Sequence, residues 1–329
     1  MQTEPVTPTF TQTAPLLEQD EALTDDLAEI LQGLARPQKA LSPKFFYDER
    51  GSALFDAICE LPEYYPTRTE LQIMRSHIDE IAGLIGPRAG VIEFGSGSSL
   101  KTRILLEHLA SPAAYIPVDI SRDHLVATAD SLAQDFPDLE VLPVAADFTH
   151  PFPLPSPRIP PDRHLVYFPG STIGNFAPPA ALELLRVMYQ EAGPGGALLI
   201  GIDLKKDADV LHRAYNDSAG ATAEFNLNLL RRLNNEFEAD FQLDNFRHRA
   251  IWNEAHGRIE MHLVSLREQD VTVAGEQFHF ARDEFLVTEY SHKYAPAEFH
   301  EMAAQAGFVP TGSWTDPRGW FSVQLCDRR

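Results

Sequence analysis

The chain has 329 residues, which is more than one compact domain usually needs and favours two domains. Its 27 Lys and Arg residues against 48 Asp and Glu residues give a formal net charge of -21, which would repel a phosphate backbone, so we expect no nucleic-acid partner. The apolar share of 44% is that of an ordinary globular protein. The longest apolar stretch, residues 197–202, is too short to span a bilayer, and the N-terminus has no secretory pattern. We therefore expect no membrane association and a cytoplasmic location.

The first third of the chain changes character several times. Residues 1–16 are rich in Thr, Pro and Gln and predict a disordered tail, whereas the apolar spacing over residues 20–34 predicts a helix. Pro62 and Pro66 bracket residues 63–65 and predict a rigid, non-helical bend. Thr67 and Glu70 have the spacing of a capping box, which predicts that a long helix begins there.

Short apolar runs alternate with helical or loop stretches between residues 90 and 203. This alternation predicts βαβ units and a parallel sheet that is covered by helices on both faces. A helix over residues 297–306 and two later strands would extend the sheet to seven strands. The apolar runs that predict the first five strands are residues 91–95, 114–121, 139–148, 164–171 and 196–203.

Residues 205–294 predict a separate lobe. Apolar residues recur every fourth position from Phe225 to Phe237 and predict a helix, and residues 249–266 predict a hairpin that turns at residues 254–257. We therefore expect an α/β fold in which a Rossmann-like, seven-stranded sheet carries an inserted α+β lobe. The expected division is a tail at 1–16, a lobe formed by 17–66 and 204–294, and a sheet domain formed by 67–203 and 295–329.

A glycine-rich loop follows the first predicted strand. Residues 93–99 read EFGSGSS and precede a helical run, an arrangement that lets the backbone and a helix N-terminus approach a ligand. Leu100 stands where a dinucleotide fingerprint needs glycine, and it also breaks the P-loop pattern. The segment resembles instead the acidic E-x-G-x-G loop of class I S-adenosylmethionine-dependent methyltransferases. Asp119 suits the two ribose hydroxyls and Asp147 with Phe148 suits adenine, although each Asp alone could simply cap a helix.

Several longer segments resemble one family, the histidine Nα-methyltransferases that make hercynine in ergothioneine biosynthesis. The resemblance covers about residues 40–329 in the same order. The segments that carry it are LPEYYPTRTE, EFGSGSSLKTR, FPGSTIGNF, AYNDSAGATAEFN, ADF, RIEMHL, TEYSHKY and WTDP.

The resemblance implies roles for individual residues. Tyr64, Asn175 and Tyr215 would hold the amino and carboxylate groups of histidine, with Tyr64 and Asn175 nearest to the chemistry. Glu289 and Ser291 would hold the imidazole. The remaining implied contacts are Met261 for the substrate and Tyr47, Gly95, Lys101 and Gly170 for the cofactor.

The residue types themselves are compatible with these roles, but each has a plainer interpretation. Glu289 and Ser291 share one face of a strand with Lys293, and a carboxylate beside a hydroxyl suits an imidazole, yet an exposed polar face would look the same. Asn175 follows a strand end where ligands of α/β sheets bind, or it simply favours a turn. Tyr64 could orient the amine, but it could equally be a core aromatic residue.

The expected activity is an S-adenosylmethionine-dependent N-methyltransferase that converts L-histidine to trimethylhistidine in three steps and releases S-adenosylhomocysteine. A methyltransferase for another amine, such as a tryptophan derivative, and a catalytically silent cofactor-binding module are the alternatives. We expect a monomer with a small amino acid as its only partner. Cys59 and Cys326 lie far apart and the histidines lack metal-ligand spacing, so we expect no metal site.

Overall fold

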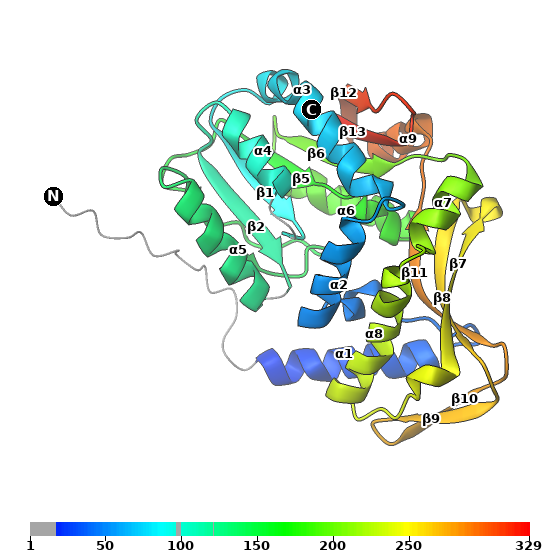
Figure 1. The fold of residues 1–329 in the computed structure, drawn as a ribbon. Helices are drawn as coiled ribbons and strands as arrows, with labels where there is room; N and C mark the ends of the chain where they lie inside the picture. Colours follow the sequence, from blue (N-terminus) through cyan, green and yellow to red (C-terminus); the bar gives the residue numbers. More distant parts are fainter. Residues whose placement is uncertain (1–17, 97–99, 121) are drawn as a thin grey trace. The chain divides into compact units, whose positions relative to one another are not determined.

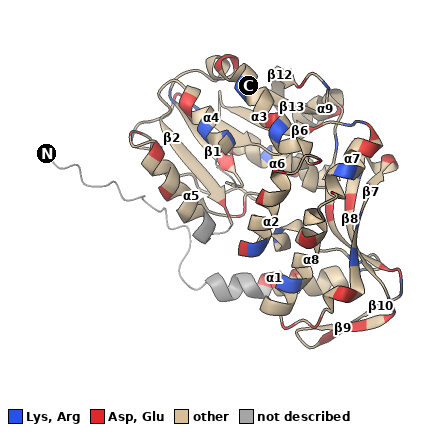
Figure 2. Cartoon of the chain, in the orientation of Figure 1, with Lys and Arg blue, Asp and Glu red and all other residues tan. Residues whose placement is uncertain are grey.

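The computed structural model describes residues 18–96, 100–120 and 122–329 and divides the chain into two compact units. Unit 1 comprises Arg68–Leu204 and Tyr294–Arg329, and unit 2 comprises Lys205–Lys293 with the described part of Pro15–Thr67 (Figure 1). The tail expected at residues 1–16 lies outside the described residues. Acidic positions occur on elements of both units, in agreement with the formal net charge of -21 (Figure 2).

Unit 1 is built on a mixed sheet with the order β12-β13-β6-β5-β1-β2-β3, in which β4 also pairs with β2. Neighbouring strands among β6, β5, β1, β2, β3 and β4 are parallel. Strand β13 runs antiparallel to both of its neighbours, β6 and β12. The strands are β1 (Ala89–Phe94), β2 (Ala114–Asp119), β3 (Glu140–Val141), β4 (Val144–Ala145), β5 (Arg163–Phe168), β6 (Ala197–Asp203), β12 (Phe308–Thr315) and β13 (Phe321–Arg328). The predicted α/β sheet is confirmed. The strand expected over residues 139–148 is two short pieces, β3 and β4, with Pro143 between them; proline cannot donate to the ladder.

Helices cover both faces of this sheet. Apolar residues of α3 (Tyr65–Ile85), α4 (Leu100–His108) and α5 (Arg122–Asp135) pack in one cluster with alternate residues of the strands. Residues of α6 (Pro178–Ala192) and α9 (Pro296–Ala306) pack in a second cluster with the other strand residues. Burial on both faces explains why β1 is apolar along most of its length and fully buried.

The capping box expected at Thr67 is wrong. Helix α3 begins at Tyr65, so Pro66 lies in its first turn. The fixed φ of proline suits a helix, and N–H groups in the first turn have no partner within the helix, so the missing N–H costs no hydrogen bond. The Thr67 hydroxyl donates to Cys59 Sγ at 3.2 Å instead of capping the helix. This start leaves the Glu70 carboxylate to make other contacts.

Unit 2 combines helices with a small antiparallel sheet of order β11-β8-β7 and a β9-β10 hairpin. The expected hairpin is confirmed, because Gly257 adopts φ 60° where β7 turns into β8. Its helices are α1 (Glu18–Leu34), η1 (Pro43–Phe46), α2 (Glu49–Cys59), α7 (Ala208–Tyr215), α8 (Ala221–Glu236), η3 (Leu243–Asn245) and η4 (Glu254–His256). Its strands are β7 (Phe246–Asn253), β8 (Arg258–Ser265), β9 (Gln269–Val273), β10 (Glu276–Phe280) and β11 (Phe285–His292). In the described part of the chain, no helix combines the length and the apolar character that crossing a membrane requires.

Candidate functional site

The glycine loop of unit 1 begins where β1 ends. Gly95 has φ +73°, a backbone conformation that side chains disfavour, and its N–H donates to the Val118 carbonyl at 2.8 Å. A Cβ at Gly95 would lie 3.6 Å from the Phe148 ring, so the loop passes close to the expected adenine cover. Gly97 and the two serines after it lie outside the described residues.

Glu93, the acid of this loop motif, is held inside unit 1. Its carboxylate accepts hydrogen bonds from the Thr102 hydroxyl at 2.8 and 2.9 Å and from the Tyr115 hydroxyl at 2.5 Å. Burial raises the pKa of Glu93 to about 7, although both hydrogen bonds act in the opposite direction. These contacts tie the end of β1 to α4 and to β2, the elements that flank the glycine loop in the chain and in the sheet.

A buried ion pair lies beside the loop, also in unit 1. Lys101 Nζ is 2.5 Å from a carboxylate oxygen of Glu70, and the two side chains are 11% and 2% exposed. The Gly170 N–H, after β5, donates to the same carboxylate at 3.0 Å. A Cβ at Gly170 would lie 3.5 Å from Lys101 Nζ. Two predicted cofactor residues, Lys101 and Gly170, are thus brought together by Glu70, a residue whose sequence context predicts only a helix start.

The other predicted cofactor residues of unit 1 lie at neighbouring strand ends. Asp119 ends β2, and its carbonyl accepts the Ala146 N–H at 3.1 Å, next to Asp147. The Asp147 carboxylate accepts from the Thr149 N–H at 2.9 Å and hydroxyl at 2.7 Å, and these contacts lower its pKa. Phe148 packs with its ring centroid 5.5 Å from that of Phe94.

Asn175 also belongs to unit 1. It ends the short helix η2 (Thr172–Asn175), which follows β5 at the carboxyl edge of the sheet. Before this helix, Ser171 adopts φ 59°, and its hydroxyl accepts the Asp203 N–H from β6 at 2.8 Å. This bond ties the GSTIGN segment, which follows β5, to the end of β6.

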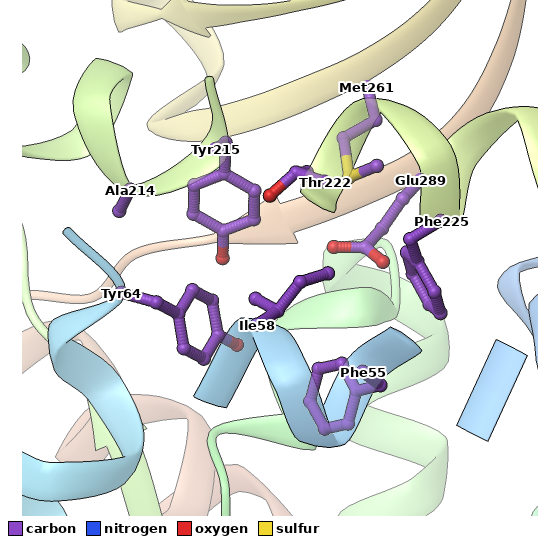
Figure 3. A pocket seen from close by; sticks show the side chains of 9 residues that line it. All are labelled: Phe55, Ile58, Tyr64, Ala214, Tyr215, Thr222, Phe225, Met261 and Glu289. Carbon is purple, nitrogen blue, oxygen red and sulfur yellow. The ribbon is translucent and has the colours of Figure 1, made fainter. Parts of the chain in front are cut away.

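Unit 2 contains a small pocket, with about 270 Å³ of empty space (Figure 3). Four predicted substrate residues line it, namely Tyr64, Tyr215, Met261 and Glu289. The other lining residues are Phe55, Ile58, Ala214, Thr222 and Phe225. Of these, Ala214, Thr222 and Phe225 lie in the AYNDSAGATAEFN segment, and Phe225 also belongs to the apolar stripe of α8, whereas Phe55 and Ile58 carried no sequence signal for the site.

Aromatic rings form much of the pocket wall. The Tyr64 and Tyr215 rings meet edge to face with centroids 6.1 Å apart, and Phe55 lies 6.1 Å from Tyr64. Tyr47 also belongs to unit 2, with its ring 5.8 Å from Phe55 and from Phe225, and it is 43% exposed. The proposed contact between Tyr47 and the cofactor stays a prediction.

Glu289 supplies the one carboxylate among the lining residues. It lies directly opposite Met261 in the register of β11 and β8, and its side chain points into the pocket (Figure 3). Burial raises the pKa of Glu289 to about 7, while the nearby charge of Lys293 acts in the opposite direction. Among the described residues, no side chain or backbone group donates a hydrogen bond to this carboxylate. The pocket therefore offers an open acceptor.

Ser291 lies on the same face of β11 and belongs to a buried polar group. Its hydroxyl is 2.9 Å from the Tyr215 hydroxyl, and Lys293 Nζ is 2.8 Å from Ser291 Oγ and 2.9 Å from the Tyr215 oxygen. The alternation along β11 predicted the shared face, but not the contact with Tyr215 on α7. In the described ranges, no three His, Cys, Asp or Glu side chains form a metal-binding group.

The chain is similar to several known proteins along most of its length. A family model described as a histidine-specific, S-adenosylmethionine-dependent methyltransferase matches residues 26–328. The chain is 41% identical to a histidine N-alpha-methyltransferase of Mycolicibacterium smegmatis over 96% of this chain and 98% of that protein. It is 40% identical to the Mycobacterium tuberculosis protein of the same name, over 90% and 93% of the two chains. It is 31% identical to the Neurospora crassa ergothioneine biosynthesis protein 1, over 89% of this chain and 34% of that longer protein.

Proposed function

The chain belongs to the family of histidine-specific, S-adenosylmethionine-dependent methyltransferases, and on this premise we propose that it methylates the α-amino group of L-histidine. Three successive transfers give hercynine, the first step toward ergothioneine, and release S-adenosylhomocysteine. The observation that carries the choice of substrate is the Glu289 carboxylate, an acceptor without a protein donor among the described residues, in a small aromatic pocket. An imidazole N–H is a matching donor.

The cofactor side of the reaction belongs to unit 1. Its residues fit S-adenosylmethionine, because Gly95 and Gly170 bring backbone close to the Phe148 ring and to Lys101. Asp119 would hold the ribose, Asp147 and Phe148 the adenine, and Lys101 the methionyl carboxylate. When bound, the cofactor would supply a methyl group on a sulfonium, whose carbon a nitrogen lone pair can attack while the carbon–sulfur bond breaks and S-adenosylhomocysteine leaves. The Glu70 contact keeps Lys101 and Gly170 in place for this task.

The protein contributes mainly orientation to such a displacement. Holding the two reactants in line can lower the barrier by several kcal/mol, and this is the role of Tyr64, Tyr215 and Asn175 on the amino-acid end. Burial raises the pKa of the Tyr64 hydroxyl, so it stays protonated and can orient the amine without acting as a phenolate base. Only the neutral amine carries a lone pair, and an α-amino group with a pKa of about 8 must lose a proton before each transfer.

The proposed working form is a monomer that acts in the cytoplasm on two small molecules. The formal net charge of -21 supports the absence of a nucleic-acid or membrane partner, since phosphate-rich surfaces would repel the chain. Mass spectrometry of purified protein with L-histidine and S-adenosylmethionine tests the function. We expect mono-, di- and trimethylated histidine to accumulate in turn. Cofactor binding without any methylated histidine would contradict the proposal.

A further inference from the structure

Lys293 is a buried cation to which the proposed reaction assigns no role. It follows β11 directly and is 3% exposed. Its ammonium group contacts the hydroxyls of Ser291 at 2.8 Å and Tyr215 at 2.9 Å. A buried charge is unfavourable unless hydrogen bonds and nearby charges compensate it. Lys293 therefore depends on the two hydroxyls to which the proposed function assigns contacts with the substrate.

The ammonium determines which way the hydrogen bonds run. It has three donors and no acceptor, so the oxygens of Ser291 and Tyr215 both accept from it. These two hydroxyls also lie 2.9 Å apart. Either hydroxyl can donate across this contact, and the phenol is the more acidic of the two and therefore the better donor, which assigns the hydrogen of this bond to Tyr215. Ser291 Oγ then accepts twice, which fills both lone pairs and leaves its own hydrogen for a ligand.

From this geometry we propose that Lys293 is a positioning residue that makes Ser291 a hydrogen-bond donor, so that Glu289 and Ser291 together select a neutral imidazole. The inference rests on the proposed function. The ionised Glu289 carboxylate only accepts, and Ser291 in this arrangement only donates. One acceptor and one donor match the N–H and the bare nitrogen of a neutral imidazole. An imidazolium has two N–H groups and an indole has no acceptor nitrogen, so both leave Ser291 without a partner.

The electrostatics support the same assignment. Burial alone favours the protonated form of Glu289, and the positive charge of Lys293 opposes it. The ammonium therefore favours the accepting form of Glu289 while it fixes the donating form of Ser291. Lys293 thus favours both groups that recognise the imidazole, the accepting carboxylate of Glu289 and the donating hydroxyl of Ser291.

The test compares L-histidine with the two pyrrolylalanines, whose rings keep one N–H and replace the acceptor nitrogen by C–H. The wild type is expected to prefer histidine in kcat/KM. Lys293→Met removes the ammonium with little change of volume and is expected to lower this preference roughly tenfold, because Ser291 is no longer forced to donate. The KM for S-adenosylmethionine should stay the same, which separates this role from a general structural one.

The chain offers a matched control and a second variant. Lys206 Nζ contacts the Tyr65 hydroxyl at 2.7 Å, also in unit 2, and neither residue lines the pocket, so Lys206→Met should keep the preference. Ser291→Ala removes the donor directly and should lose the preference, and it decides the question if Lys293→Met does not fold. An unchanged preference in either Lys293→Met or Ser291→Ala overturns the proposal. A wild type that methylates none of the three amino acids overturns the proposed function instead.

Discussion

Lys101 Nζ lies 2.5 Å from a carboxylate oxygen of Glu70, and the same carboxylate accepts the Gly170 N–H at 3.0 Å. One acidic side chain of α3 thus joins the start of α4 to the segment after β5. Gly201 of β6 makes room for it, because a Cβ there would lie 2.2 Å from the carboxylate. The contacts explain how a residue outside the glycine loop shapes the cofactor side of unit 1.

Replacing Glu70 by Gln should destabilise unit 1 and weaken cofactor binding. The variant leaves the Lys101 ammonium buried without its counter-charge, and breaking a buried pair in this way typically lowers the free energy of unfolding by about 3–5 kcal/mol. Urea unfolding measures this loss, and calorimetry with S-adenosylhomocysteine measures the affinity. The exposed Arg88–Asp162 pair of unit 1 provides the control. Asp162→Asn should change the free energy of unfolding by less than about 1 kcal/mol, and equal losses in the two variants would refute the role given to Glu70.

Asp119→Ala should weaken the cofactor without unfolding the protein. A hydrogen bond to a charged group contributes about 1.5–3 kcal/mol, so the dissociation constant should rise roughly 10- to 100-fold. Calorimetry with S-adenosylhomocysteine measures the change, and Asp130→Ala on the exposed side of α5 is the control. An affinity equal to that of the wild type would show that Asp119 does not hold the ribose.

The sequence predicted the sheet because its signals are local. Each parallel strand is an apolar run, and Gly95 follows the first one directly. The sequence does not identify Glu70 as a site residue, because its partner Lys101 is 31 positions away and the spacing from Thr67 to Glu70 predicts only the start of a helix. The helix begins earlier, at Tyr65, because Pro66 can occupy its first turn.

The pocket of unit 2 also depends on contacts between residues that are far apart in the sequence. Strand alternation predicted that Glu289, Ser291 and Lys293 share a face, and the contacts with Tyr215 confirm this for Ser291 and Lys293. Tyr215 comes from a helix 78 positions before Lys293, and nothing in a single sequence pairs the two. Phe55 and Ile58 of α2 resemble ordinary core residues, since any buried helix face carries such side chains.

Glu289→Ala should raise the KM for histidine more than the KM for S-adenosylmethionine. The carboxylate lines the unit 2 pocket and has no donor among the described residues, so its loss removes a ligand contact while breaking no hydrogen bond of the protein itself. Steady-state kinetics with each substrate varied in turn measures the two constants. The exposed Glu276 on β10 gives a control in the same unit. Equal increases in both constants, or an effect in Glu276→Ala, would contradict a role in substrate binding.

The pKa of Glu93 predicts how the stability of the protein depends on pH. Burial raises this pKa from 4.5 to about 7, so between these values the folded protein keeps a proton that the unfolded chain has released. The stability that this group contributes is therefore fully present below pH 4.5 and is lost as the pH rises through about 7. Within that window the free energy of unfolding should fall by up to about 1.4 kcal/mol per pH unit from this group alone.

Glu93→Gln removes this titration while it keeps the shape of the side chain. In this window the wild type releases the Glu93 proton when it unfolds, and the variant has no such proton to release. The stability advantage of the wild type over the variant should therefore shrink as the pH rises from 5 toward about 7. Urea unfolding at several pH values across this window measures the difference, and the comparison cancels titrations that the two proteins share, including that of Glu289. Glu107→Gln, at an exposed position of α4, is expected to follow the wild type. Parallel curves for wild type and Glu93→Gln would mean that Glu93 is ionised in the folded protein throughout the window, and that its hydrogen bonds from Thr102 and Tyr115 outweigh its burial.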